Sequence, residues 1–317
     1  MSTSRFVTWL SLAVIGALSF RESAAAGLVV TDDTGATVRL ASPAQRIVSL
    51  APGATEMLFA AGAGSRIVAT VVGADEPAAA RAIVRIGDAN ALQYERLKAL
   101  KPDVVVAWKD MTNTLVIESL AKLNLTIYYV SVRTLEDIPR SVRRLGVLAG
   151  TGPVAESAAR DLERRIATLP TARSSLAAAA RAGLSAEPLP VFYMIWDVPL
   201  YTVGGRNVMA DAIARCGGRN LYDDIDFPAP IVEFEDIKKR DPALILMAAP
   251  PITARDWRER WNRFPTVSAV KNRQLKSFSD PRLTRQGPSA IDAVPALCRV
   301  IAEARTTPLL LREGPSR

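Results

Sequence analysis

Apolar residues along this chain fall into two patterns, short unbroken runs and longer stretches with helical spacing. The clearest example is residues 93–108, QYERLKALKPDVVVAW, where Leu97 and Leu100 share one side of a short amphipathic helix. The helix stops at Lys-Pro-Asp, because a proline disfavours helical backbone in the residue before it. Residues 104–106 then form an all-apolar run, which predicts a buried strand.

The same unit returns in the second half of the chain as VEFEDIKKRDPALILMA. Each copy carries a glutamate at the same distance before the proline: Glu95 before Pro102, and Glu235 before Pro242. The separation of the copies is too long for a solenoid repeat and fits one α/β lobe. We therefore expect two similar lobes, with the ligand cleft between them.

Residues 27–150 alternate between strand and helix patterns. The first pattern, over 27–40, is a pair of short strands joined by Asp-Asp-Thr-Gly, a hairpin turn signal. Strands that alternate with helices predict a mostly parallel central sheet flanked by helices. We expect residues 27–150 to form an N-terminal α/β lobe and residues 187–317 to form a C-terminal one.

The strand pattern over residues 46–50 runs into a loop of small residues that contains Pro52 and Gly53, and a helix is expected from about residue 56. Free backbone N–H groups point outward where such a loop meets a helix, so α/β proteins often bind ligands there. Pro52 and Gly53 are therefore candidate ligand-binding residues.

Residues 151–186 are rich in alanine, arginine and glutamate. Ala155, Leu162 and Ile166 recur at helical spacing, which predicts one long helix joining the lobes. Pro170 conflicts with this prediction, because a proline inside a helix kinks or divides it.

The N-terminal residues 1–26 have the features of a secretory signal peptide. A basic residue, Arg5, precedes an apolar stretch, and small residues follow it before position 27. The alternative is a single membrane anchor, for which the apolar stretch is short. No cysteine precedes Cys216, so a lipid anchor just after the signal is not expected. We expect a secreted, periplasmic protein that is a free monomer.

Cys216 and Cys298 are the two cysteines, and disulfides persist in an exported protein. Their pairing would stabilise the fold by roughly 4 to 5 kcal/mol in the chain-entropy model. The alternative is two separate buried thiols. Two cysteines without histidine do not make the usual zinc sites, so no metal site is expected.

The formal net charge is +8. The basic residues are scattered over predicted helix faces, whereas nucleic-acid binding usually needs a concentrated basic stripe interleaved with aromatics. We therefore expect no nucleic-acid partner and a solvated basic surface with some preference for anionic partners.

The sequence lacks the common signatures of catalysis. Because it contains no histidine, histidine-based triads and HExxH metal sites are excluded. No Walker loop or GxSxG motif is present, and no cofactor is expected. Carboxylate-based catalysis stays open, but a binding protein is the stronger interpretation.

Four segments together resemble a known family. They are RIVSLAPGATEMLFAAGAGSRIVAT, RIGDANALQYERLKALKPDVVVAW, PLYTVGGRNVMADAIARCGGRNLYDD and PAPIVEFEDIKKRDPALIL. They look like the periplasmic substrate-binding proteins of ABC importers for cobalamin, haem and iron-siderophores, and are most similar to the cobalamin-binding branch. The resemblance implies two α/β lobes joined by one long helix, with the ligand between their facing edges and little closure on binding.

The resemblance also implies that Glu95 and Glu235, one on each lobe, pair with arginines of the membrane permease. Two exposed carboxylates in equivalent positions would fix the orientation of docking. The alternative is that they are ordinary acids at helix starts. The cobalamin branch also carries one cysteine before paired glycines and one in the final helix, which supports pairing of Cys216 with Cys298.

For the ligand, Trp108 ends its strand and matches an aromatic residue that the cobalamin branch places against the corrin. A flat macrocycle requires an aromatic platform with polar groups at its rim. The alternative is that Trp108 caps the core. Asp75, Trp196, Tyr201 and Arg285 fall in loops or at strand ends expected to point the same way.

Three positions depart from the branch, which commonly has further aromatics where this chain has Gly73, Ala89 and Ala229. The pocket is therefore expected to suit cobalamin, a modified corrinoid or another large chelate.

Two other ligand classes stay open within the family. Haem is less favoured because the chain has no histidine ligand, although Tyr94, Tyr201 or Tyr222 would offer an alternative. A ferric siderophore would suit the positive charge, with Arg282 and Arg285 supplying contacts. A carboxylate-dependent exported enzyme is the alternative outside the family. The hypothesis from sequence is a corrinoid-binding protein that delivers its ligand to the permease of an ABC importer.

Overall fold

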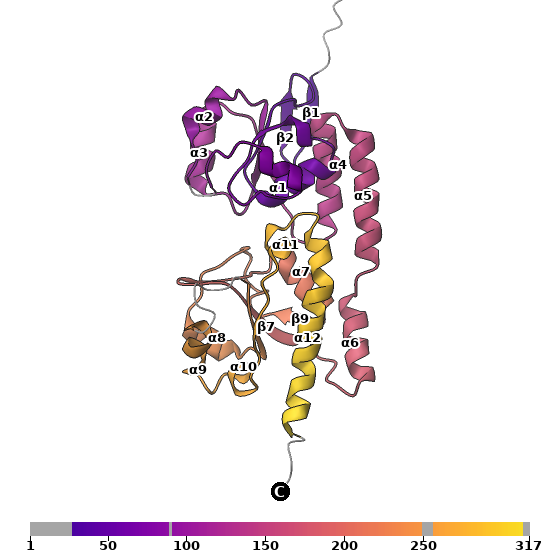
Figure 1. Ribbon diagram of the computed structural model, residues 1–317, viewed down its shortest axis with the longest axis vertical. Coiled ribbons are helices and arrows are strands. Elements are labelled where there is room, and N and C mark those ends of the chain that lie inside the picture. Colours follow the sequence, from indigo (N-terminus) through magenta and orange to yellow (C-terminus); the bar gives the residue numbers. More distant parts are fainter. Residues whose placement is uncertain (1–26, 89–90, 249–255, 313–317) are drawn as a thin grey trace, which may run out of the picture.

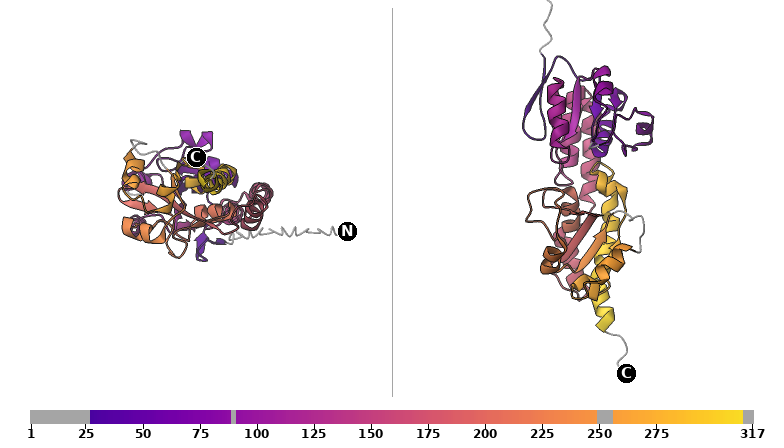
Figure 2. Two further views of the ribbon diagram at one scale, coloured as in Figure 1. Left: turned by 90° about the horizontal axis from the view of Figure 1, so that it is seen from below. Right: turned by 90° about the vertical axis from the view of Figure 1, so that its left-hand side faces the viewer.

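A computed structural model describes residues 27–88, 91–248 and 256–312, and in it the chain forms two α/β lobes stacked along the long axis (Figures 1 and 2). The expected signal peptide, residues 1–26, and Ala89 lie outside the described residues. In the described part of the chain, no helix combines the length and the apolar character needed to cross a bilayer.

The N-terminal lobe contains a four-stranded parallel sheet in the order β4-β3-β5-β6. Alternate residues of the central strand pack on opposite faces, Val104 and Val106 in one core and Val105 in another, which explains its unbroken apolar run. An antiparallel hairpin at the N-terminus confirms the predicted turn. The strands are β1 (Leu28–Thr31), β2 (Thr37–Leu40), β3 (Ile47–Ser49), β4 (Ile67–Ala69), β5 (Val104–Trp108) and β6 (Ile127–Val130).

Helices cover both faces of this sheet. Met57 of α1 and Leu145 of α4 pack in one core, and Leu97 of α2 and Leu120 of α3 pack in the other. The helices are α1 (Pro52–Ala60), α2 (Tyr94–Ala99), α3 (Thr114–Lys122) and α4 (Asp137–Ala149), with short 3₁₀ turns η1 (Gly64–Arg66) and η2 (Ala78–Ala82).

The start of α1 differs from the prediction. The helix begins at Pro52, because proline has no N–H to satisfy and its fixed φ suits the first helical turn. Pro52 and Gly53 are therefore part of the helix and not of the loop before it.

The C-terminal lobe is built around β7, which is parallel to β9 and β10 and antiparallel to the edge strand β8. Phe192 of β7 packs with Trp257 and Trp261 in its core. The strands are β7 (Leu189–Asp197), β8 (Leu200–Thr202), β9 (Gly218–Asn220), β10 (Leu244–Met247) and β11 (Leu275–Ser277). The helices are α7 (Val208–Arg215), α8 (Phe234–Arg240), α9 (Asp256–Asn262), α10 (Ser268–Lys271), α11 (Pro281–Arg285) and α12 (Ala290–Arg312).

The connection between the lobes is two helices, so the prediction of one continuous helix over 151–186 was wrong. The helix α5 (Gly152–Ala167) packs against α4 of the N-terminal lobe, and α6 (Ala172–Arg181) packs against α7 of the C-terminal lobe. Pro170 lies in the break, and Thr171 starts the second helix with a capping box that includes Ser174. The break is thus specified by the sequence itself (Figure 1).

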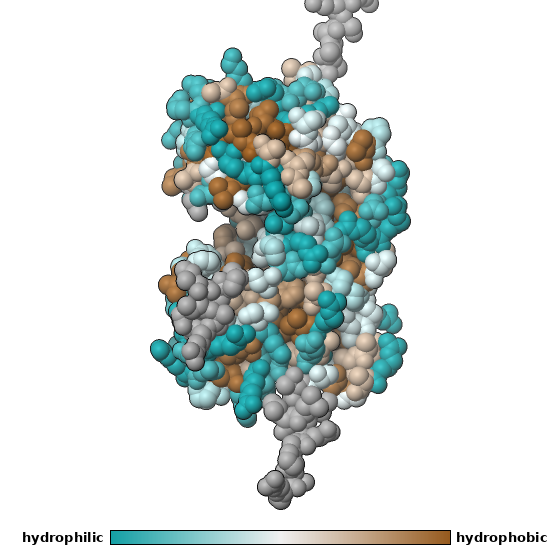
Figure 3. All heavy atoms as spheres, in the orientation of Figure 1, coloured by the Kyte–Doolittle hydropathy of each residue, from teal (hydrophilic) through white to brown (hydrophobic). Residues whose placement is uncertain are grey.

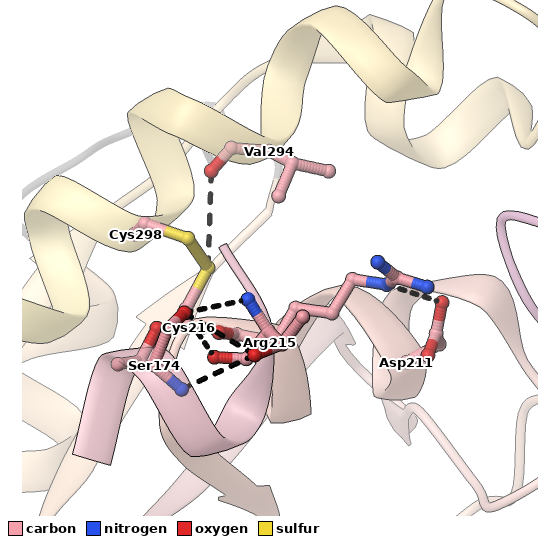
Figure 4. Close-up of a disulfide and its surroundings, with 8 residues drawn as sticks. Ser174, Asp211, Arg215, Cys216, Val294 and Cys298 are labelled. Atoms are coloured by element: carbon pink, nitrogen blue, oxygen red, sulfur yellow. Dashed lines mark hydrogen bonds and ion pairs between the residues drawn. A yellow bond between two sulfur atoms is a disulfide. The ribbon is translucent and has the colours of Figure 1, made fainter. Parts of the chain in front are cut away.

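A disulfide joins Cys216, at the end of α7, to Cys298 in α12, which confirms the predicted pairing (Figure 4). The alternative of two separate thiols is thereby excluded. The bond fixes the last helix to the body of the C-terminal lobe.

Candidate functional site

A cavity of about 430 Å³ lies between the two lobes. Figure 3 shows the molecular surface hollowed between the upper and lower lobes. Most of the cavity wall follows the carboxyl ends of strands in the N-terminal sheet, and residues 284–286, at the end of α11 in the other lobe, supply the rest. It is lined by Leu50, Ala51, Pro52, Val71, Val72, Asp88, Trp108, Met111, Thr112, Thr284, Arg285 and Gln286.

The topology explains this position. Parallel strands end at a common edge, and the segments that leave β3, β4 and β5 meet there. In α/β proteins this edge is where ligands bind. The segment after β11 reaches the same point from the C-terminal lobe, so residues far apart in sequence complete one cavity.

Trp108 belongs both to the hydrophobic core and to the cavity wall, the two roles considered for it from the sequence. It is the last residue of β5, only 5% exposed and part of the hydrophobic core, and it also lines the cavity. Its backbone N–H donates to the hydroxyl of Thr112, another wall residue, at 3.1 Å. The indole is thus a rigid apolar element of the cavity wall.

Arg285 is the cationic residue of the wall. Its side chain is 19% exposed, and Nη1 lies 4.0 Å from Oε1 of Glu56, beyond hydrogen-bond distance. Asp88 and Gln286 add polar groups to a wall that is otherwise mainly apolar. An apolar cavity with a few polar groups is the usual form of a small-molecule site.

Gly53 is not on the cavity wall. A Cβ on this residue would lie 3.1 Å from both the backbone nitrogen of Gly287 and Cζ3 of Trp108. Gly53 therefore lies at a contact between the lobes, next to the indole of Trp108.

Asp75, Trp196 and Tyr201 also lie outside the residues that line this cavity. Asp75 is exposed and forms an ion pair with Arg85 at 2.9 Å. Trp196 is 52% exposed, and its indole N–H donates to the carbonyl of Val198. The structure thus brings together Pro52, Trp108 and Arg285 and separates them from these three candidates.

An exposed apolar surface surrounds Trp196 on the C-terminal lobe. Residues 228–232 run beside 200–204, with Tyr201 paired to Ile231. This brings exposed Phe227 and Ile231 to the same sheet edge as Trp196. Sequence reasoning missed both residues, because the strand-like pairing that places them is not visible in their local pattern.

Sequence reasoning also missed wall residues of the N-terminal lobe. Val72 is 65% exposed and Met111 is 46% exposed, and both side chains line the cavity. A usable signal was present, because Val72 and Met111 each lie three residues after the end of a parallel strand, β4 and β5 respectively. Thr284 and Gln286 gave no such signal.

Of the tyrosines and arginines considered for other chelates, Arg285 lines the cavity and the others do not. Tyr222 is fully buried in the C-terminal core beneath Arg240, so it is not available as an iron ligand. Tyr94 and Tyr201 do not line the cavity, and Arg282 is held by Asp280 at 2.7 Å. Among the described residues, no cluster of three or more His, Cys, Asp or Glu side chains is arranged to hold a metal.

Glu95 and Glu235 lie on different lobes, in the first turns of α2 and α8. Both residues are exposed, and Glu235 accepts a hydrogen bond from Lys238 at 3.3 Å. Figure 1 shows α2 and α8 along the same left-hand side of the molecule. The two helices that carry these glutamates thus lie on one side of the molecule.

Polar contacts also hold the lobes together. Arg206 of the C-terminal lobe lies 3.7 Å from Asp110 of the N-terminal lobe. Asp211 accepts from the backbone N–H of Leu135 at 3.0 Å. These contacts join the two lobes.

Comparisons with known proteins agree with this geometry. Residues 47–280 match the family described as periplasmic binding protein. A relative from Pectobacterium atrosepticum, named vitamin B12-binding protein, is 30% identical over 264 residues, which are 83% of this chain and 91% of the relative.

Solved structures give the same result for the fold. The periplasmic vitamin B12 binding protein BtuF of Vibrio cholerae matches with a TM-score of 0.69 and 29% identity, covering 83% of this chain and 98% of that chain. A periplasmic heme binding protein from Pseudomonas aeruginosa matches with a TM-score of 0.66 and 21% identity, covering 81% and 92%. The second likeness concerns the fold alone.

Proposed function

Since this chain belongs to the periplasmic binding protein family, we propose that it captures a corrinoid, cobalamin or a close relative, and delivers it to an ABC importer. The observation that carries the proposal is the cavity between the lobes with Trp108 in its wall. The relatives named for vitamin B12 add support, because they match along most of both chains.

The cavity chemistry suits a large ligand with an apolar face and polar edges. Val72, Trp108 and Met111 offer apolar contact, while Arg285 and Gln286 offer hydrogen-bond donors. The apolar sheet edge around Trp196 and Phe227 on the other lobe would extend the contact for a ligand larger than the cavity itself.

Haem is the second candidate, because proteins named as heme-binding share the fold. Its support is weaker: the chain contains no histidine, and no tyrosine lines the cavity. Without a histidine or tyrosine in the wall, the thioether of Met111 would be the remaining candidate for an axial haem ligand.

Glu95 and Glu235 are proposed as the docking pair for the permease. Their exposure on separate lobes gives a contact with two fixed points. Such a contact recognises orientation as well as charge.

Titration of the mature protein with cyanocobalamin, haemin and a ferric siderophore, followed by tryptophan fluorescence and calorimetry, tests the ligand. Tight binding of cyanocobalamin alone supports the proposal. Tight binding of haemin without cyanocobalamin would replace it with the haem alternative. Turnover of a chromogenic ester or glycoside with no binding of any chelate would indicate an exported enzyme.

A further inference from the structure

A second cavity, of about 620 Å³, shares Arg285 with the ligand cavity. It lies where α1 of the N-terminal lobe meets α11 and α12 of the C-terminal lobe. We call it the rear cavity. It is lined by Glu56, Phe59, Ala60, Glu76, Pro77, Arg165, Arg282, Arg285, Pro288, Ser289 and Asp292.

Glu56 is the buried acid of the rear cavity, with 5% of the residue exposed. Its Oε2 accepts a hydrogen bond at 3.0 Å from the backbone N–H of Ser289 in the opposite lobe. A Cβ on Gly287 would lie 2.9 Å from the same oxygen. The carboxyl of Glu56 is thus in direct contact with the segment that connects α11 to α12.

The other carboxyl oxygen, Oε1, is buried and has no hydrogen-bond partner among the described residues. Arg285 Nη1 is 4.0 Å away, which permits attraction but not a hydrogen bond. A buried charge that is incompletely paired is costly, whereas a neutral carboxyl group is much less so.

The surrounding charges do not remove this cost. Arg282 and Arg165 face the rear cavity but are held by Asp280 at 2.7 Å and by Asp292 at 2.6 Å. Glu76 adds a negative charge and is paired with Arg81 at 3.5 Å. Burial raises the pKa of Glu56. Hydrogen bonds from Ser289 and the positive charge of Arg285 partly oppose this rise, and the negative charge of Glu76 adds to it.

We propose that Glu56 is a positioning residue whose protonation favours the lobe contact that holds residues 284–289 against the ligand cavity. Thr284, Arg285 and Gln286 of this segment line the cavity, so ligand binding is accompanied by proton uptake at Glu56. This inference rests on the proposed function for its ligand but not for its effect on stability.

The direction follows from linkage. When the lobes separate at this point, water reaches the carboxyl group of Glu56. Its pKa then returns toward the ordinary glutamate value of about 4.3. The form with the lobes in contact holds the proton more tightly. Ligand affinity is therefore greatest at acid pH and falls as the pH rises through the raised pKa of Glu56.

Calorimetric titration with cyanocobalamin between about pH 4 and pH 8, in buffers of different ionisation enthalpy, measures both Kd and proton uptake. The Kd of the unaltered protein should rise with pH. Over the whole titration, Kd should increase by a total factor of about ten for each unit by which lobe contact raises the pKa of Glu56. Glu56→Gln keeps an acceptor for Ser289 and removes the charge. It should show a Kd independent of pH, equal to that of the unaltered protein at acid pH, without proton uptake.

Two further variants separate positioning from general damage. Glu56→Ala lacks the acceptor for the Ser289 N–H and should bind weakly at every pH. Glu118→Gln alters an exposed glutamate of α3 that does not line the rear cavity and should keep the pH dependence of the unaltered protein. The inference is overturned if Glu56→Gln retains that pH dependence, or if Glu56→Ala binds as tightly as the unaltered protein.

A measurement without ligand keeps the inference testable if cyanocobalamin does not bind, an outcome that would reject the proposed function instead. The stability that protonated Glu56 contributes is fully present below its ordinary pKa and is lost as pH rises through the raised one. The Tm of Glu56→Gln should therefore increasingly exceed that of the unaltered protein as pH rises. A Tm difference that does not change with pH would overturn the inference.

Discussion

The carbonyl oxygen of Arg285 occupies the space that a side chain on Gly53 would need: a Cβ there would lie 2.1 Å from it. The two lobes therefore meet backbone to backbone at the edge of the ligand cavity, and only glycine permits this approach. The contact places the guanidinium of Arg285 between the two cavities.

Gly53→Ala should force residues 285–287 away from α1. Overpacking of this kind typically costs about 1 to 3 kcal/mol of folding free energy, and ligand affinity should fall as the cavity wall moves. Urea denaturation and calorimetric titration measure the two effects. Gly152→Ala is the control: a Cβ there meets no atom within 4 Å, so the change should leave Kd unchanged and should not lower stability.

Trp108→Phe should weaken ligand binding by more than it weakens the fold. The phenyl ring still fills part of the space of the indole in the core, but it offers the ligand a smaller aromatic surface in the cavity wall. We expect a loss of about tenfold in affinity, or roughly 1.4 kcal/mol. The matched change Trp257→Phe lies in the C-terminal core and should reduce stability while leaving Kd unchanged. Equal effects of both changes on Kd would assign Trp108 to the core alone.

Replacing Glu95 and Glu235 by alanine should abolish most uptake of labelled cobalamin by cells while Kd for the purified protein stays within about twofold, since neither residue lines the cavity. Each single replacement should give a partial loss. Glu118→Ala removes an exposed glutamate of α3 and serves as the control. A fall in ligand affinity of the double variant would contradict the docking assignment.

Arg143 should make the fold more sensitive to acid. Its guanidinium bonds Glu156 at 2.7 Å and also bonds Glu163, both on α5, and these bonds lower the pKa of each glutamate. The resulting stability is present above the ordinary glutamate pKa and is lost as pH falls through the lowered values. Arg143→Met should flatten the decline of Tm at acid pH, whereas Arg164→Met, which alters a pair within α5, should not.

The disulfide should account for a large part of the stability of the C-terminal lobe. It closes a sequence separation of 82 residues. In the chain-entropy model, this corresponds to about 4 to 5 kcal/mol. Urea denaturation of the Cys216→Ser, Cys298→Ser double variant measures the loss, and an unchanged midpoint would show that packing of α12 alone is sufficient.

The large-scale organisation of this protein was predictable because its signals are local. The repeated helix–proline–strand unit around Glu95 and Glu235 predicted two lobes, and the apolar run in β5 predicted a buried strand. Pro170 also carried a correct local signal, which the helical propensity of its neighbours outweighed in the prediction.

The lobe contacts were not predictable in the same way. Glu56 and Ser289 are separated by 233 residues, and nothing in the sequence near either residue identifies the other. Likewise, Gly53 was interpreted as a ligand-binding glycine, although its neighbour is the backbone of Arg285. The ends of the strands and the loops that follow them were the best local indication of the cavity wall. They identified Pro52, Trp108 and Arg285 but missed Val72 and Met111.

In the described part of the chain, the polypeptide passes from one lobe to the other once, at the break between α5 and α6. Each lobe is consequently a contiguous stretch that a single protease cut at residues 168–171 would release as a separate fragment. Because the lobes contact each other through Glu56, Asp110 and Asp211, the two fragments should reassemble without a covalent link. Their dissociation constant would then measure directly how strongly the two halves attract each other.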